Sequence, residues 1–185
     1  MKIQPSDLQR VAVVGTSCSG KTTFADSLSV ILGIPHIELD ALYWLPGWVE
    51  RPTAEFCTLV EKETSSNRWV SDGNYSNVRD IVWGRATDVV WLNYSFPLVF
   101  SRALRRSICR ALTIEELFSG NRESIRKTFF SSDSILVWII KSYRRNRVKY
   151  RAFKNSPQWK HLQFWEFKRP SEAADFLSLC KDTVD

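Results

Sequence analysis

The sequence has few of the features that mark membrane, zinc-binding or disulfide-stabilised proteins. Its four cysteines, Cys18, Cys57, Cys109 and Cys180, lie far apart and form no C-x-x-C pair. This spacing predicts neither a zinc site nor a disulfide framework, and it fits a reducing cytosol. The apolar run at residues 135–140 is too short to span a bilayer, and the charged N-terminus is unlike a signal peptide. We therefore expect a cytoplasmic protein with no membrane partner.

Internal repeats, low-complexity tracts and linkers are also missing from the 185 residues. A chain of this length is expected to form one domain, residues 1–185, with a complete hydrophobic core. Aromatic residues make up 13% of the chain and include eight tryptophans, which excludes a disordered composition.

Positive charge is concentrated in one segment. Residues 102–154 hold fourteen Arg or Lys and only four Asp or Glu, a net charge of +10. The rest of the chain then carries −4 of the overall +6. A basic insert in a mildly acidic body indicates that this segment handles anions.

The most specific pattern is a phosphate-binding loop, or P-loop, after a predicted strand at residues 11–14. The spacing G-x-x-x-x-G-K-T is formed by Gly15, Gly20, Lys21 and Thr22. The glycines permit a backbone whose N–H groups point at phosphate oxygens, while Lys21 brings charge to the β- and γ-phosphates and Thr22 offers a hydroxyl to Mg²⁺. The residues expected to bind the nucleotide are Gly15, Thr16, Ser17, Cys18, Ser19, Gly20, Lys21, Thr22 and Thr23.

A helix is expected directly after the P-loop. Apolar residues recur at helical spacing from Phe24 to Leu32, and Gly33 can end the helix. The positive end of this helix would point at the same phosphates. A chance glycine-rich turn would have to satisfy every fixed position of the motif between a strand and a helix. The sequence therefore predicts a site for a nucleoside triphosphate together with Mg²⁺, with the base, ATP or GTP, left open.

Strands are expected to alternate with helices along the rest of the chain. Such alternation predicts an α/β fold of three layers, with a five-stranded parallel sheet between helices. The further strands are expected at residues 36–40, 69–72, 88–93 and 163–167. Helices are expected from Thr53 as N-cap, around residues 77–85, from Pro97, and from Ser171 as N-cap. Residues 41–52 read as an aromatic loop without regular structure.

The sequence resembles the adenylate kinase-like branch of P-loop kinases, and more closely the small bacterial DNA topology modulation proteins. The resemblance covers nearly the whole chain, and it is most specific in the P-loop and in residues 36–48, 72–75 and 120–124. It implies a five-stranded parallel sheet with a mobile lid between the fourth and fifth strands. Residues 102–154 would then form the lid, and residues 41–67 the acceptor-binding segment.

The resemblance also implies roles for four charged residues. Asp72 matches the carboxylate that holds Mg²⁺ at the end of the third strand, with a helix-capping or turn aspartate as the alternative. Arg102 and Arg106 match a pair at the entrance of the lid, where they would neutralise charge on the transferring phosphoryl group, unless they belong to a solvated basic face. Asp40 resembles the carboxylate that sugar- and shikimate-type kinases use on an acceptor hydroxyl, with a strand-end turn residue as the alternative.

The sequence departs from adenylate kinases where those enzymes grip the phosphate of an acceptor nucleotide. Tyr43 and Ser76 occupy the positions of two arginines, so an AMP-like acceptor would lose two charge-assisted contacts. Arg51 or Arg79 could replace the missing pair by folding inward. Trp44 and Trp48 either line the acceptor pocket or pack beneath the loop, and packing is the expectation for at least one of them.

Two functions are consistent with these features. The first is an ATP- and Mg²⁺-dependent phosphotransferase, in which Lys21, Arg102, Arg106 and Asp40 act on the phosphoryl group and an unidentified small acceptor. The second is a nucleotide-switched regulator whose basic lid contacts nucleic acid or a protein. Asp40 and the aromatic segment favour the enzyme, whereas the basic insert favours the regulator; the insert carries no recognisable base-stacking motif.

Overall fold

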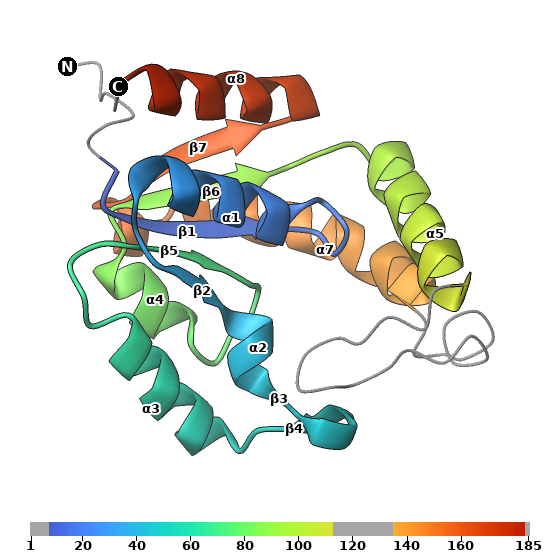
Figure 1. The fold of residues 1–185 in the computed structure, drawn as a ribbon, viewed down its shortest axis with the longest axis horizontal. Coiled ribbons are helices and arrows are strands. Elements are labelled where there is room, and N and C mark those ends of the chain that lie inside the picture. The colour runs from blue at the N-terminus through green and yellow to red at the C-terminus, as the bar shows by residue number, and fades with distance from the viewer. Residues whose placement is uncertain (1–7, 113–134, 184–185) are drawn as a thin grey trace.

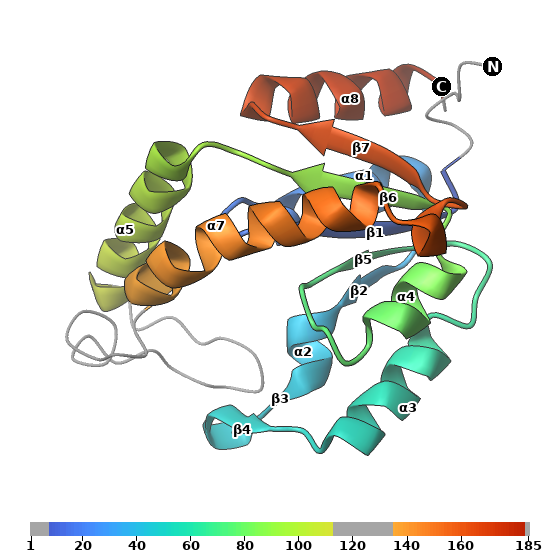
Figure 2. The same cartoon turned by 180° about the vertical axis from the view of Figure 1, so that it is seen from behind.

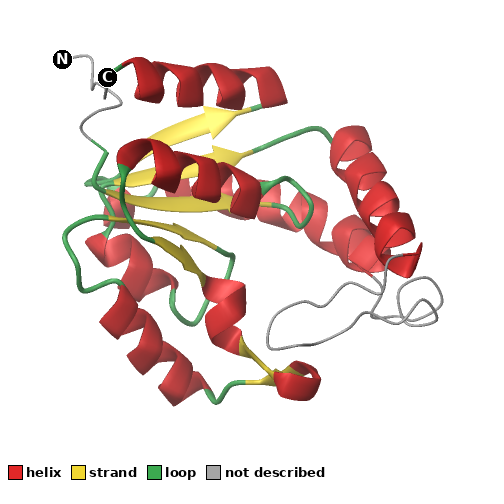
Figure 3. Ribbon diagram, viewed as in Figure 1, coloured by secondary structure: helices red, strands yellow, loops and turns green. Residues whose placement is uncertain are grey.

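The computed structural model describes residues 8–112 and 135–183, and the side chains of residues 8–109 and 137–183. Its centre is a five-stranded parallel sheet in the order β2-β5-β1-β6-β7, which confirms the predicted fold class (Figure 1, Figure 3). The strands are β1 (Arg10–Gly15), β2 (His36–Glu38), β5 (Trp69–Asp72), β6 (Asp88–Leu92) and β7 (Gln163–Phe167).

Helices cover both faces of this sheet. The helices α1 (Lys21–Leu32) and α8 (Pro170–Asp182) pack on one face, where the aromatic rings of Phe24, Phe167 and Phe176 meet. In β1, Val11 and Val13 belong to this core, whereas Ala12 and Val14 belong to the core on the opposite face. Because successive side chains of a strand alternate between faces, a strand buried on both sides is apolar throughout.

The opposite core is rich in tryptophan and fixes helix α7 to the sheet. Helices α3 (Thr53–Glu63), α4 (Arg79–Arg85) and α7 (Ile135–Lys154) lie on this side, and α7 is seen in front of the sheet in Figure 2. The ring of Trp83 in α4 lies 6.3 Å from that of Tyr150 and 5.4 Å from that of Phe153, both in α7. These contacts hold the C-terminal half of α7 close to α4.

The helices α5 (Phe96–Leu112) and α7 form a basic arm, of which α5 and the N-terminal part of α7 extend beyond the ends of the strands (Figure 2). The strand arrowheads in Figure 1 point toward the side on which α5 lies. The arm includes the described part of the predicted lid, and residues 120–124 of the family resemblance lie outside the described residues. No helix within the described ranges is both long enough and apolar enough to cross a bilayer.

The segment after β2 is more regular than the sequence predicts. The predicted strand at residues 36–40 ends at Glu38, and helix α2 (Leu39–Tyr43) begins at once, so Asp40 lies in a helix. The expected irregular loop at residues 41–52 contains a short hairpin. Its parts are β3 (Trp44–Leu45), the 3₁₀ turn η2 (Pro46–Trp48) and β4 (Val49–Glu50). Gly47 and Trp48 make the reversal possible because their φ angles are +77° and +59°.

Three predicted helix starts are also corrected. Pro52 is the N-cap of α3, so Thr53 is its first helical residue, and α5 begins at Phe96 rather than at Pro97. Helix α8 begins at Pro170 rather than after Ser171, because Glu172 accepts hydrogen bonds from the backbone N–H groups of the two residues before the helix.

Gly73 allows the chain to leave β5 close to α2. Its φ is +143°, and a Cβ atom there would lie 2.8 Å from the Leu39 Cβ. We expect Gly73→Ala to lower the free energy of unfolding by about 1–3 kcal/mol through strain and overpacking. Gly84→Ala is the matched control, because nothing lies within 4 Å of its added methyl group in helix α4, and it should stabilise by about 0.5–1 kcal/mol. Urea unfolding of both variants checks this, and equal loss in the two would contradict it.

Candidate active site

The P-loop forms a tight turn between β1 and α1. The Ser19 N–H donates to the Thr16 carbonyl oxygen at 3.0 Å, and Gly20 has a left-handed φ of +93°. A Cβ at Gly15 would lie 2.7 Å from Ser19 Oγ and 2.8 Å from the Leu92 carbonyl oxygen, so only glycine fits this close approach. Lys21 begins helix α1, and the first N–H groups of a helix have no partner within the helix and can bind an anion. The loop therefore has the shape of a phosphate cradle.

Asn74 clamps the start of the P-loop. Its side-chain Nδ2 donates to the Gly15 carbonyl oxygen at 2.5 Å, and its Oδ1 accepts from the Gly15 N–H at 3.3 Å. The same Oδ1 accepts from the Tyr150 hydroxyl of α7 at 2.8 Å. Asn74 therefore connects the P-loop to the basic arm. No sequence pattern predicts a role for Asn74, although it lies in the segment 72–75 that carries the family resemblance.

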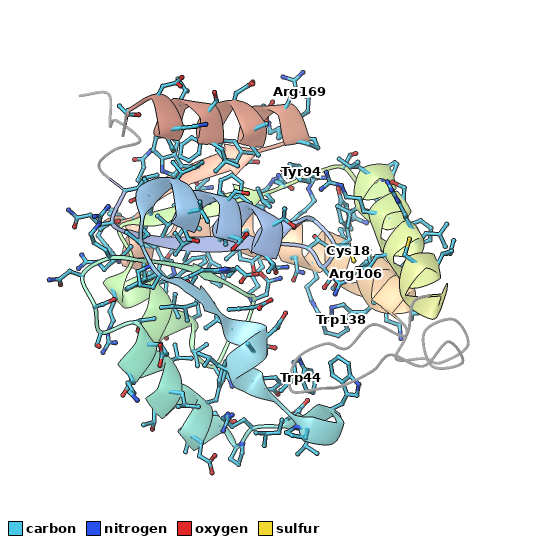
Figure 4. All side chains as sticks on the ribbon, in the orientation of Figure 1. Cys18, Trp44, Tyr94, Arg106, Trp138 and Arg169 are labelled. Carbon is cyan, nitrogen blue, oxygen red and sulfur yellow. The ribbon has the colours of Figure 1, made fainter. Side chains whose placement is uncertain are left out.

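The two predicted arginines of α5 lie in different surroundings. Arg102 reaches the P-loop, where its Nη1 donates to the Ser19 carbonyl oxygen at 2.9 Å and its guanidinium lies over the Tyr94 ring at 5.4 Å. Arg106 is exposed one turn later, and its positive charge acts on Glu38. Figure 4 labels Arg106 and Cys18 in the space between the sheet and α5. Arg102 thus holds the loop, whereas Arg106 acts on the acidic residue Glu38.

The predicted metal residues meet at the start of α1. The Thr22 hydroxyl donates to Asp72 Oδ2 at 2.8 Å, although the two residues are 50 positions apart in the sequence. The other oxygen, Oδ1, lies 3.0 Å from His36 Nε2. Asp72 is buried, with 3% of its surface exposed, so these two partners fix the orientation of a carboxylate that water barely reaches. No sequence pattern predicts this contact of His36.

Several ionisable groups around Asp72 influence one another. Burial opposes the charge on His36, but the hydrogen bond and the negative charge of Asp72 outweigh it and raise the pKa of His36 above 6.5. Burial, together with the charges of Asp72 and Asp40, raises the pKa of Glu38. The site therefore concentrates negative charge beside the P-loop, which a cation would relieve.

The residues present fit a magnesium ion that is held mainly by nucleotide phosphates. Among the described residues, no three His, Cys, Asp or Glu side chains are grouped so that they could hold a metal by themselves. Magnesium commonly keeps several waters and takes one or two carboxylates together with substrate phosphates. Thr22 and Asp72 supply that smaller donor set at the head of α1.

Asp40 is held by a tyrosine within an aromatic cluster. The Tyr75 hydroxyl donates to Asp40 Oδ1 at 2.5 Å, and burial together with the charge of Asp40 raises the pKa of Tyr75. The Tyr75 ring lies 4.5 Å from that of Tyr43 and 5.1 Å from that of Phe56. Tyr43 is therefore part of the support for Asp40.

Trp44 and Trp48 pack against each other at the hairpin. Their ring centroids are 5.5 Å apart at an angle of 79°, and both side chains are half-buried. Trp44 also lies edge-on to Tyr43, with the centroids 5.0 Å apart. These contacts give both tryptophans a packing role, and Figure 4 shows Trp44 on the side of α2 and β3.

The two arginines that could replace the missing phosphate contacts differ in position. The Arg51 Nε donates to the Leu42 carbonyl oxygen at 2.7 Å, and its Nη1 lies 3.7 Å from Glu55. Arg51 is thus engaged within the hairpin segment. Arg79 instead lines a small pocket together with Lys149 and Tyr150 of α7.

Stability should depend on pH through His36. A histidine whose pKa is raised by folding stabilises the protein fully below its unfolded pKa of about 6.5, and this contribution disappears as the pH rises through the folded value. In magnesium-free buffer, the free energy of unfolding should therefore fall more from pH 6 to pH 8.5 in the parent than in His36→Gln. Urea titrations across this range provide the measurement. Parallel curves for the two proteins would contradict the assigned pairing of His36 with Asp72.

Neither a family model nor a curated protein sequence matches the chain. The predicted resemblance to the DNA topology modulation proteins therefore stays a prediction.

A shikimate kinase and a gluconokinase are among the solved structures that are similar to most of the chain. A shikimate kinase from Bacteroides thetaiotaomicron has a TM-score of 0.52 and 15% identity, covering 96% of this chain and 98% of its own. A gluconokinase from Sinorhizobium meliloti 1021 has a TM-score of 0.50 and 15% identity, covering 95% and 91%. At this identity the likeness concerns architecture. The chain has the fold of P-loop kinases.

Proposed function

We propose that the protein is an ATP- and Mg²⁺-dependent phosphotransferase that acts on a hydroxyl group of a small acceptor. The observation that carries this proposal is the hydrogen bond between the Thr22 hydroxyl and Asp72 Oδ2 at the head of α1. A P-loop threonine and a strand-end carboxylate are the two protein groups that a nucleotide-bound magnesium ion requires. The similarity to two solved kinases supports the reaction class.

The nucleotide side of the site would bind and orient the triphosphate. The P-loop N–H groups and the Lys21 ammonium would hold the β- and γ-phosphates, and Arg102 keeps the loop in shape through the Ser19 carbonyl oxygen. Thr22 and Asp72 would hold the magnesium ion, which supplies positive charge to the phosphate oxygens. Arg106, exposed on the same helix as Arg102, is the further cation available to stabilise the transferring group.

The acceptor side would present a hydroxyl to Asp40. Tyr75 occupies Oδ1 of Asp40, so Oδ2 is the oxygen proposed to orient the acceptor hydroxyl or to take its proton. A neutral hydroxyl suits this position better than a phosphate, because the carboxylates of Glu38, Asp40 and Asp72 would repel an anion.

Binding of the nucleotide is tested with Lys21→Ala. Removing a cation from a site for several phosphate charges should weaken the affinity for Mg-ATP at least tenfold, about 1.4 kcal/mol.

Asp72→Asn should instead reduce the dependence of ATP binding on Mg²⁺, since the charge is lost while the shape is kept. Calorimetric titrations check both, with Lys160→Ala as an exposed-lysine control. An affinity of Lys21→Ala equal to that of the control would refute the P-loop assignment.

Acceptor preference is tested by supplying AMP at millimolar concentration and measuring ADP formation from ATP. We expect negligible turnover, because Tyr43 and Ser76 provide no charge for an acceptor phosphate beside Asp40. Turnover at an ordinary kinase rate, on the order of 1–100 per second, would show that AMP is the acceptor.

The role of Asp40 is tested with an acceptor that the protein phosphorylates on a hydroxyl group. Asp40→Asn should lower the rate of that reaction by about 10²–10⁴-fold, and Tyr75→Phe should lower it less.

A further inference from the structure

Two cations from distant parts of the chain meet over one aromatic ring. Arg79 belongs to the first turn of α4, and its guanidinium carbon lies 4.5 Å from the centroid of the Phe153 ring. Lys149 belongs to α7, and its ammonium nitrogen lies 5.7 Å from the same centroid. Both residues are partly buried. The fold therefore brings two positive charges together in a place that water reaches only in part.

These charges have no acidic partner in the part of the chain that the structure describes. By contrast, Lys154 pairs with Glu166 at 3.0 Å and Arg169 with Glu172 at 2.9 Å. The Arg79 Nη2 donates to the Ser76 carbonyl oxygen at 3.3 Å, a neutral acceptor.

The positive charges near Lys149 affect its pKa. Burial lowers its pKa, and the charges of Arg79 and Arg145 lower it further. A bound anion would remove this repulsion, because it neutralises two cations that the fold already holds in place.

The two cations line a pocket that adjoins the candidate active site. Its volume is about 20 Å³, room for one water-sized group such as a single oxygen atom of an acid. Ser71, Asn74, Tyr75 and Tyr150 supply further polar groups to its lining, and the remaining lining residues are mostly apolar. Asn74 bonds to Gly15 of the P-loop, and Tyr75 bonds to Asp40. A small group in this pocket would therefore lie next to residues that contact both the nucleotide loop and the proposed acceptor carboxylate.

We propose that Arg79 and Lys149 bind an acidic group, a carboxylate or a phosphate, at one end of the acceptor. The binding of an anion by this pair does not depend on the proposed function. The assignment of that anion to the acceptor does rest on the proposed function. Arginine offers a planar pair of donors and lysine a point charge, a combination that suits either acid. The pair supplies, from α4 and α7, positive charge for an end of the acceptor that is not the phosphorylated one. The acceptor class is then a small molecule with a neutral hydroxyl for Asp40 and an acidic group away from it.

Calorimetry on the protein loaded with Mg²⁺ and a non-hydrolysable ATP analogue tests this proposal. The loaded protein is titrated with glycerol 3-phosphate, D-glycerate and glycerol, which share a three-carbon skeleton and differ at one end. We expect at least one of the two anions to bind about tenfold or more tightly than glycerol. The anion that binds better identifies the acid as phosphate or carboxylate. Arg79→Gln and Lys149→Gln should each weaken its binding by about the same factor.

Two variants act as controls for charge and folding. Arg151→Gln removes an exposed cation from the same helix and should leave anion binding as in the parent. Lys149→Arg keeps the charge and should retain binding, which separates loss of charge from loss of structure.

The proposal is overturned if glycerol binds as tightly as both anions. It is also overturned if the two glutamine variants behave like Arg151→Gln. Failure of the ATP analogue to bind in the loading step, with anion binding still dependent on Arg79, would refute the proposed function and support this site.

Discussion

The close approach of Gly15 to the end of β6 is the constraint on which the site depends. No side chain fits there, because a Cβ would lie 2.8 Å from the Leu92 carbonyl oxygen. The P-loop turn that follows Gly15 is held by hydrogen bonds from two side chains. Asn74 bonds to both backbone groups of Gly15, and Arg102 bonds to the Ser19 carbonyl oxygen. A loop that must present backbone N–H groups to phosphates is thus shaped before any phosphate binds, which lowers the cost of ordering it.

Negative and positive side chains form two separate groups near the carboxyl ends of the strands. Carboxylates gather around His36, where Glu38, Asp40 and Asp72 raise the proton affinity of their neighbours. Cations lie on the basic arm and on α4, where Arg79 and Lys149 share the ring of Phe153. Because the nucleotide and its metal would lie between these groups, the carboxylates suit the metal and the hydroxyl, and the cations suit the acidic groups. Asn74 and Tyr150 connect the two sides through one hydrogen bond.

The fold class could be predicted from the sequence because its signals are local. A buried strand, a G-x-x-x-x-G-K-T loop and an amphipathic helix are contiguous, and the alternation of strands and helices repeats along the chain. The contacts made by Asn74 and by His36 could not be predicted, since their partners are 76 and 36 residues away and no local pattern marks such a pair. The hairpin after α2 was missed for a different reason. Its two strands have two residues each, too few for a periodic pattern, and its turn uses a left-handed Trp48.

Transfer of a phosphoryl group is the central claim, and isotope labelling tests it most directly. The protein is incubated with Mg²⁺, ATP fully labelled with ¹⁸O on its γ-phosphoryl group, and a mixture of small hydroxyl-bearing acids, and the products are analysed by mass spectrometry. A phosphotransferase should give an organic phosphate ester with three ¹⁸O atoms, and Lys21→Ala should not. Label recovered only in inorganic phosphate would mean that water is the acceptor. That result would contradict the account and favour a nucleotide-driven switch, in which the exposed Arg105, Arg144 and Arg145 of the basic arm contact a partner.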